Sequence, residues 1–372
     1  MNANTFMEIL GSDYYTGVPD SLLRPLCDCI MDEYGTDPVH HIIAANEGNA
    51  AAIAAGYHLA TGKTAVVYMQ NSGEGNIINP LASLLNEKVY GIPVIFVIGW
   101  RGEPGVHDEP QHIFQGEVTL KLLETMEVPY LVVDQETSEA ELRMKMEEFK
   151  GILESGRQIA LVIKKNALTN DNKLVYKNDN VLTREEAIRM IVKYAGDDPI
   201  VCTTGKASRE LFEIREQEGM SHEHDFLTVG SMGHASSIAL GIALQKPDKR
   251  IWCIDGDGAA LMHMGAMAVI GKIAPDNLVH VVINNGAHES VGGLPTAMKG
   301  SNTCRMAMES GYKNGCKVND LDGLEKALAS ITTKKELSFI EIETNLESRK
   351  DLGRPTTSAR DNKDCFKGYI ER

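Results

Sequence analysis

Two short runs in the second half of the chain combine residue types that can hold a phosphate and a divalent cation. A GDG run (256–258) follows a predicted strand at 250–254, and an Asn-Asn pair (284–285) follows a predicted strand at 278–283, with 25 residues between GDG and the pair. Glycine lets the backbone approach a phosphate and turn into a helix, whose first N–H groups attract an anion. Asp and Asn side chains offer hard oxygen ligands. Together with phosphate oxygens, a backbone carbonyl and water, they complete the octahedron of Mg²⁺.

Each run also has an ordinary structural interpretation. A lone GDG is often just a turn, and two asparagines before Gly286 are a common hairpin signal. Their shared placement favours ligand binding, because both follow predicted parallel strands and open α/β sheets bind ligands at the carboxyl ends of strands. The GDG run and the Asn-Asn pair together therefore predict a site for a phosphate and a metal ion.

Glu47 is a third candidate, because an ionisable side chain is unusual where it stands. It lies at a predicted strand-to-helix junction in AANEGNAAAIAAGY (44–57), and the residues after it are almost all small or apolar. A catalytic carboxylate and a helix N-terminal charge favoured by the helix dipole both fit this position. The residues alone leave the two interpretations open.

Short apolar runs alternate with helical patterns along the chain, which predicts parallel sheets with helices on both faces. The predicted strands are 41–44, 64–69, 93–98, 130–133 and 160–164, then 200–203, 226–229, 251–254, 278–283 and 339–342. The predicted helices are 47–59, 77–85, 120–126, 139–153, then 185–194, 209–216, 235–244, 259–273 and 324–331.

A polar, non-periodic stretch divides this pattern into two halves. We therefore predict an α/β fold of two doubly wound parallel-sheet domains, residues 1–170 and 183–372, joined by a linker at 171–182. Thr183 and Glu186 have the spacing of a capping box, which predicts that a helix starts directly after the linker.

The composition narrows the classes of partner. Lysine and arginine number 37 against 52 acidic residues, a net charge of −15, so we expect neither nucleic acid nor an anionic membrane as partner. The seven cysteines contain no CxxC pair, and no apolar run reaches membrane-spanning length or follows a basic N-terminus. These features predict a cytoplasmic location.

Several of these runs together resemble the thiamine-diphosphate-dependent 2-oxo acid decarboxylases. GDG, 25 residues and NN form that family's signature, and the pattern E-x-x-A-x-x-x-A-x-G-Y starting at Glu47 resembles its activating-glutamate stretch. The resemblance implies thiamine diphosphate and Mg²⁺ as cofactors. It also implies a pyrimidine-binding domain followed by a diphosphate-binding domain.

The resemblance implies roles for the metal and diphosphate residues. Asp257 and Asn285 would ligate Mg²⁺ by side chain and Ala287 by its backbone carbonyl, while Gly256 and Gly258 would line the diphosphate.

It also implies residues that face the cofactor rings. Glu47 would hydrogen-bond the pyrimidine N1′ and so activate the cofactor as an ylide. In the run VGSMG (229–233), the carbonyl of Gly230 would hold the 4′-amino group, and Met232 would keep the cofactor bent. A plain strand-to-helix turn is the alternative for this run.

Most family members carry a third domain between these two, whereas here a short linker joins them. That compact form resembles the phosphonopyruvate and sulfopyruvate decarboxylases. The supporting runs are TGVPDSLL (16–23), MQNSGEGNIINPLASL (69–84), WRGEPGVHDEPQH (100–112), TTGKASRELFE (203–213), DFLTVGSMGHASSIALGIAL (225–244) and HESVGGLPT (288–296).

This resemblance implies a carboxy-lyase that converts 3-phosphonopyruvate to phosphonoacetaldehyde and CO₂ in phosphonate biosynthesis. It also implies a homo-oligomer with active sites at subunit interfaces. One alternative is decarboxylation of sulfopyruvate. A second is a carboligase, which the absence of a middle domain disfavours, and a third is a non-catalytic binding module. Retention of Glu47, Asp257 and Asn285 argues against the last.

A doubly charged phosphonate favours Arg, Lys and hydroxyl partners. The candidates in matched loops and helix starts are Ser21, Asn71, Ser72, Arg101, Lys206, Arg209 and His288. His112 is a candidate for proton handling, since the family places a histidine about 65 residues past its glutamate. That motif often has a His pair, whereas Gln111 precedes a single histidine here.

Overall fold

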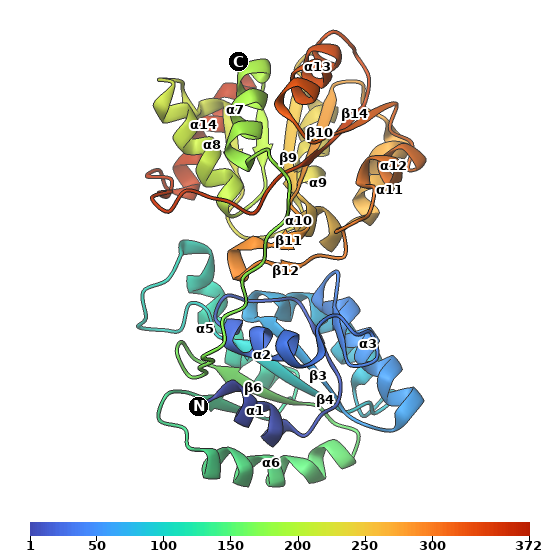
Figure 1. The fold of residues 1–372 in the computed structure, drawn as a ribbon, viewed down its shortest axis with the longest axis vertical. Helices are drawn as coiled ribbons and strands as arrows, with labels where there is room; N and C mark the ends of the chain where they lie inside the picture. Colours follow the sequence, from blue (N-terminus) through green and yellow to red (C-terminus); the bar gives the residue numbers. More distant parts are fainter. The chain divides into compact units, whose positions relative to one another are not determined.

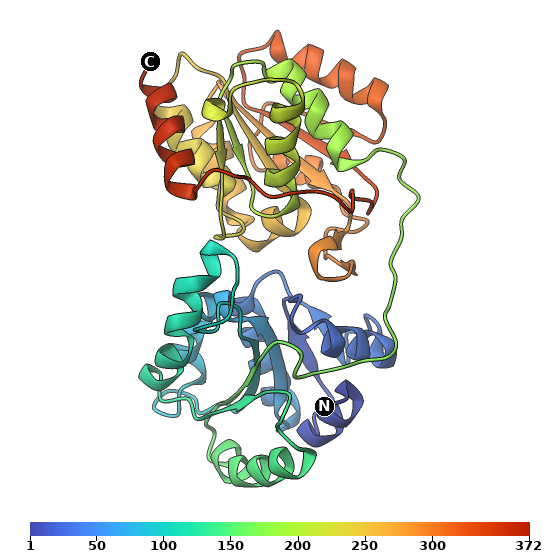
Figure 2. The ribbon, with the colours of Figure 1, turned by 90° about the vertical axis from the view of Figure 1, so that its left-hand side faces the viewer.

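The computed structural model describes all residues 1–372, which divide into two compact units, Met1–Val175 and Tyr176–Arg372 (Figure 1). The division falls inside the polar stretch 171–182. Each unit contains a six-stranded parallel sheet with helices packed on it, as Figure 2 shows from a second side. No helix in the structure is both long and apolar enough to cross a membrane.

The sheet of the first unit has the strand order β2-β1-β3-β4-β6-β5. Its strands are β1 (Tyr15–Gly17), β2 (His41–Ile43), β3 (Ala65–Gln70), β4 (Val94–Gly99), β5 (Tyr130–Val133) and β6 (Ile159–Ile163). Its helices are α1 (Ala3–Leu10), α2 (Arg24–Tyr34), α3 (Glu47–Thr61), α4 (Glu74–Pro80), α5 (Pro110–Thr125) and α6 (Glu139–Glu154).

The sheet of the second unit has the order β13-β14-β10-β9-β7-β8. Its strands are β7 (Ile200–Cys202), β8 (Asp225–Leu227), β9 (Ile251–Gly256), β10 (Leu278–Asn284), β13 (Asn314–Val318) and β14 (Ser338–Glu343), with a small hairpin of β11 (Ala287–His288) and β12 (Leu294–Pro295). Its helices are α7 (Arg184–Ala195), α8 (Lys206–Gln217), α9 (Ala235–Gln245), α10 (Asp257–Met262), α11 (Gly265–Ile273), α12 (Thr303–Glu309), α13 (Leu321–Thr332) and α14 (Ala359–Glu371).

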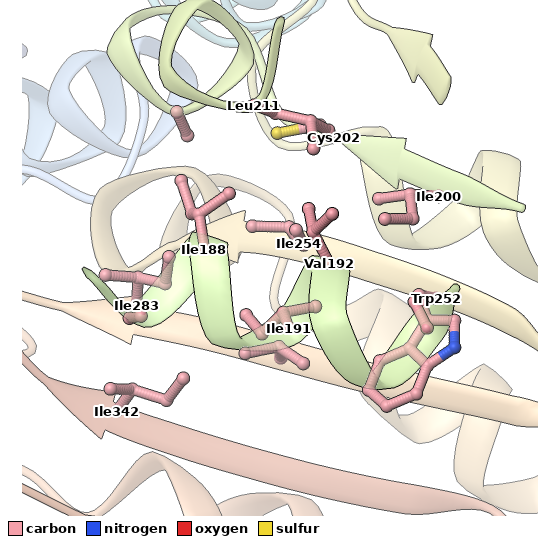
Figure 3. Close-up of a cluster of buried hydrophobic side chains, with 14 of the residues drawn as sticks. Ile188, Ile191, Val192, Ile200, Cys202, Leu211, Trp252, Ile254, Ile283 and Ile342 are labelled. Atoms are coloured by element: carbon pink, nitrogen blue, oxygen red, sulfur yellow. The ribbon is translucent and has the colours of Figure 1, made fainter. Parts of the chain in front are cut away.

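Buried apolar faces hold these layers together. Figure 3 shows Ile188 and Ile191 of α7 directed at the strands that carry Ile254 and Ile283, and all four side chains are fully or almost fully buried. Burying one such side chain contributes about 1.5–3 kcal/mol. In the first unit α3 presents small alanines instead, which allow the helix to lie close to its sheet.

The fold class is confirmed, with two parallel doubly wound sheets. Several elements differ from prediction. Strand β1 was not predicted, because three residues are too short to show a period, yet it pairs with both β2 and β3. The predicted helix 259–273 begins instead at Asp257 and is broken into α10 and α11 at His263.

Both sheets have a point where the strand order reverses. It lies between β1 and β3 in the first unit and between β7 and β9 in the second. Open α/β sheets bind ligands outside the carboxyl ends of strands at such points. The loops that follow β1, β3, β7 and β9 are therefore where functional side chains are expected.

Candidate active site

The first unit gathers polar side chains beyond the carboxyl ends of four neighbouring strands. Ser21 follows β1, Glu47 follows β2, Asn71 follows β3 and Arg101 follows β4. The strand order β2-β1-β3-β4 places these loops next to one another along one edge of the sheet.

Glu47 is buried at this edge, with 4% of its surface exposed. Its Oε2 accepts a hydrogen bond of 2.6 Å from Nδ2 of Asn76. A Cβ added to Gly73 would lie 2.5 Å from Oε1 of Glu47, so any larger residue there would displace the carboxyl group. Burial raises the pKa of Glu47, and the bond from Asn76 partly offsets this. A carboxyl group in this state is suited to sharing a proton.

Arg101 is held by two neighbours. Its Nε donates to Oδ2 of Asp108 at 2.8 Å, and its Nη1 donates to Oγ of Ser21 at 3.1 Å. Although burial opposes it, the hydrogen bonds from Arg101 hold the pKa of Asp108 well below its usual range. Arg101 and Ser21 line a cavity of about 450 Å³ together with Arg24 and Lys173. Glu47 does not line this cavity.

Asn71 is fully buried, and both of its amide hydrogens are used. Nδ2 donates to the backbone oxygen of Arg101 and to Oγ1 of Thr119, both at 2.8 Å. These bonds tie the loops after β3 and β4 to α5. Ser72 is exposed and donates to Gln70. Asn71 thus supports the loops, while Ser72 remains accessible.

His112 lies in the first turn of α5 with 9% of its surface exposed. Burial lowers its pKa, with a further contribution from Arg101, so the imidazole is neutral near pH 7. Its Nδ1 has no hydrogen-bond partner. The residue is therefore a buried neutral imidazole with one unused nitrogen.

In the second unit, Asp257 and the Asn285 loop follow the neighbouring strands β9 and β10. Oδ2 of Asp257 accepts a hydrogen bond of 2.5 Å from Oγ1 of Thr296. Oδ1 of Asn285 accepts one of 3.0 Å from the backbone N–H of Ala287. Burial raises the pKa of Asp257 to about 6, an effect that Thr296 opposes. A buried carboxylate beside amide and carbonyl oxygens is the donor set that Mg²⁺ prefers.

The glycines of GDG leave room for a ligand. A Cβ added to Gly256 would meet no atom within 4 Å, whereas one on Gly258 would lie 3.4 Å from both Cε1 of His288 and Cε of Met232. Gly258 of α10, His288 of β11 and Met232 of the loop after β8 thus converge. Burial lowers the pKa of His288 to about 4, and its Nε2 has no partner. The residues present fit a diphosphate and metal site.

The GSMG loop has an unusual backbone. Gly230, Ser231 and Gly233 have φ values of 73°, 48° and 91°, in the left-handed region that favours glycine. The N–H of Gly230 donates to Oγ1 of Thr204 at 3.1 Å, which joins the loops after β7 and β8. A non-glycine residue in this conformation is strained, and such strain concentrates at functional loops.

The two basic candidates of the second unit lie in the first turn of α8. Lys206 donates to Oε1 of Glu289 at 2.7 Å and to Oγ of Ser348 at 2.8 Å, and Arg209, three positions later, is half-buried. Lys206 is therefore engaged with a carboxylate in this structure.

The sequence interpretation missed several supporting residues, namely Gly73, Asn76, Glu289 and Thr296. All four lie inside the runs 69–84 and 288–296 that carry the family resemblance. Their position inside these runs was the only signal in the sequence that could have identified them. Their individual contacts depend on strand order and could not be read from spacing.

Comparison with known proteins agrees with this geometry. The thiamine pyrophosphate enzyme N-terminal TPP binding domain matches residues 5–123, and the C-terminal TPP binding domain matches residues 203–342. The phosphonopyruvate decarboxylase of Streptomyces viridochromogenes is 32% identical, covering 97% of this chain and 92% of the relative. That of Streptomyces hygroscopicus is 33% identical, covering 93% and 87%.

A sulfopyruvate decarboxylase from Methanosarcina acetivorans is 28% identical, covering 90% of this chain and 88% of the relative. Both units thus match thiamine pyrophosphate enzymes, and the nearly full-length similarity is to decarboxylases. The chain belongs to the phosphonopyruvate decarboxylase family of thiamine pyrophosphate enzymes.

Proposed function

We propose that this enzyme decarboxylates 3-phosphonopyruvate to phosphonoacetaldehyde and CO₂, using thiamine diphosphate and Mg²⁺, in phosphonate biosynthesis. The main support is similarity over nearly the whole chain to two phosphonopyruvate decarboxylases, combined with a buried Glu47 whose oxygen is fixed by Asn76. In this assignment unit 1 is the pyrimidine-binding domain and unit 2 the diphosphate-binding domain.

The second unit would hold the cofactor by its charged end. Asp257, Asn285 and the carbonyl of Ala287 would bind the metal, and Gly256 and Gly258 would leave space for the diphosphate. Gly230 and Met232 would contact the ring portion. When bound, the cofactor accepts the electron pair that departing CO₂ leaves behind.

Glu47 would act on the pyrimidine ring. Its burial makes the proton affinity of the carboxyl group high, so it can hold a proton at the ring nitrogen. His112 and His288 are neutral imidazoles with an unused nitrogen each. His112 is the candidate for proton transfer near neutral pH, whereas His288, whose pKa burial lowers to about 4, would act as a neutral hydrogen-bonding group.

For the phosphonate we favour Arg101 with Ser21. Both line one cavity, and Arg101 stays charged because Asp108 accepts from it. Ser72, Lys206 and Arg209 are further candidates. Lys206 would have to leave its ion pair with Glu289 in order to bind the substrate. Asn71 would act indirectly, by holding the loop that carries Arg101.

We further propose a homo-oligomer in which a second copy of the chain completes each active site. Mixing Glu47→Gln with Asp257→Asn subunits tests this. In randomly mixed dimers one site in four combines two intact residues, so activity should return to about a quarter of the parent value. If each chain supplied both residues to its own site, mixing would restore nothing.

Similarity to sulfopyruvate decarboxylase supports a second candidate substrate. The deciding experiment follows CO₂ release from phosphonopyruvate and from sulfopyruvate in parallel, with Glu47→Gln as the control. Preference for phosphonopyruvate, lost in the variant, is the expected result. Preference for sulfopyruvate would reassign the substrate, and no release from either would overturn the proposal.

A further inference from the structure

A charged cluster lies directly behind the amide of Asn285. Nδ2 of Asn285 donates to Oε2 of Glu289 at 3.2 Å. An ionised carboxylate only accepts hydrogen bonds, so Glu289 must face the NH₂ end of the amide. The oxygen end is thereby turned away from Glu289, to where it accepts from the N–H of Ala287.

Two cations fix Glu289. Lys206 donates to its Oε1 at 2.7 Å, and Arg184 donates to its Oε2. Arg184 is in turn bound by both carboxylate oxygens of Glu210 at 2.7 Å. The side chains of Arg184 and Glu289 are each only 10% exposed, so solvent screens these contacts weakly. Glu289 cannot rotate without breaking an ion pair on each side.

The linker segment holds the same loop from its backbone side. Nδ2 of Asn178 donates to the carbonyl of Asn285 at 3.0 Å and to that of Thr344 at 3.1 Å. The backbone of Asn285 is therefore anchored independently of Glu289. What Glu289 adds, together with the N–H of Ala287 at the oxygen end, is the orientation of the side-chain amide.

We propose that Glu289 is a positioning residue that fixes the Asn285 amide so that its oxygen faces the divalent cation. The inference rests on the proposed function only in taking Asn285 as a metal ligand. Without Glu289 only the N–H of Ala287 would hold the amide in this orientation. Rotation by half a turn then becomes easier, because the oxygen and nitrogen ends of the amide have nearly the same size. The NH₂ end would then meet the cation and repel it.

The test is Mg²⁺ affinity, measured by calorimetric titration at saturating thiamine diphosphate with no substrate present. Glu289→Ala should weaken Mg²⁺ binding by roughly 10- to 100-fold, the usual effect of removing a residue that orients a metal ligand. Glu289→Gln keeps an oxygen that can accept from Asn285 and should lose less. At high Mg²⁺ the decarboxylation rate of Glu289→Ala should recover.

Glu325→Gln is the matched control, because it removes a half-exposed acidic partner of Lys193 in the same unit. Its Mg²⁺ affinity should stay within about twofold of the parent. If Glu289→Ala fails to fold, Glu289→Leu with Lys206→Met removes the carboxylate without leaving that lysine unpaired.

An Mg²⁺ affinity within about twofold of the parent in the folded variant, with only metal-free thermal stability lowered, would overturn the proposal and leave a purely structural ion cluster. A parent protein that binds no Mg²⁺ would overturn the assignment of Asn285 itself. The two failures are thus separable.

Discussion

Nδ2 of Asn76 donates a hydrogen bond of 2.6 Å to Oε2 of Glu47, across 29 positions of the chain. The two residues lie near the starts of α4 and α3, and Gly73, which has no Cβ, leaves room beside the other oxygen of Glu47. One carboxylate oxygen is therefore fixed by an amide, which leaves the second as the site for a proton.

Replacing Asn76 with alanine should slow activation of the cofactor without removing Glu47. A hydrogen bond to a charged group contributes about 1.5–3 kcal/mol, so we expect roughly a tenfold to hundredfold slower exchange of the cofactor C2 proton. Exchange into deuterated water, followed by NMR, measures this directly. Asn79→Ala, on an exposed position of the same helix, should exchange at the parent rate. Equal rates in both variants would show that Asn76 does not act on Glu47.

Glu74 should make stability fall as pH rises. Its side chain is 1% exposed, and burial raises its pKa from 4.5 to about 8, although Thr119 and Gln115 oppose this shift. Between these values only the folded state holds the proton, so each pH unit removes up to about 1.4 kcal/mol of stability. Above pH 8 the loss is complete.

Glu74→Gln should therefore stabilise the protein at pH 8 far more than at pH 5. Denaturant unfolding at both pH values measures the difference. Glu147→Gln, at an exposed position of α6, should change stability equally at both. A pH-independent effect of Glu74→Gln would show that the carboxyl group ionises normally.

Magnesium affinity should fall in acid because Asp257 must lose its proton to bind the metal. Burial raises the pKa of Asp257 to about 6, so apparent affinity should drop about tenfold per pH unit below that value. Thr296→Val removes the hydroxyl that favours the charged form, and the drop should then begin at higher pH. Titrations from pH 5 to 8 test this, with Thr333→Val, an exposed threonine, as control. Identical profiles for all three proteins would contradict the assigned role of Thr296.

Arg101 should contribute substrate binding rather than chemistry. We expect Arg101→Met, combined with Asp108→Asn so that no carboxylate is left unpaired, to raise KM for phosphonopyruvate roughly 10- to 100-fold with little change in kcat. Arg24→Met, in the same cavity wall, should leave KM nearly unchanged. The opposite ranking of the two variants in steady-state assays would move the phosphonate to Arg24.

Much of the architecture was predictable because parallel strands buried on both faces need uninterrupted apolar runs. Strand β4 (VIFVIG) is buried at all six positions and was predicted to within one residue. The capping box of Thr183 and Glu186 is present at the predicted helix start. Strand β1 was missed, because its three residues carry no period and are ordered by pairing with β2 and β3.

The sequence by itself determined the chemical groups and the strand ends that carry them. GDG and NN lie at the ends of adjacent strands, β9 and β10, where the apolar run of each strand stops. Only the tertiary structure decided which groups work together. Thr296 reaches Asp257 across 39 positions, and Arg184 reaches Glu289 across 105. Such contacts depend on the order in which strands cross over in the sheet, and local residue patterns do not encode that order.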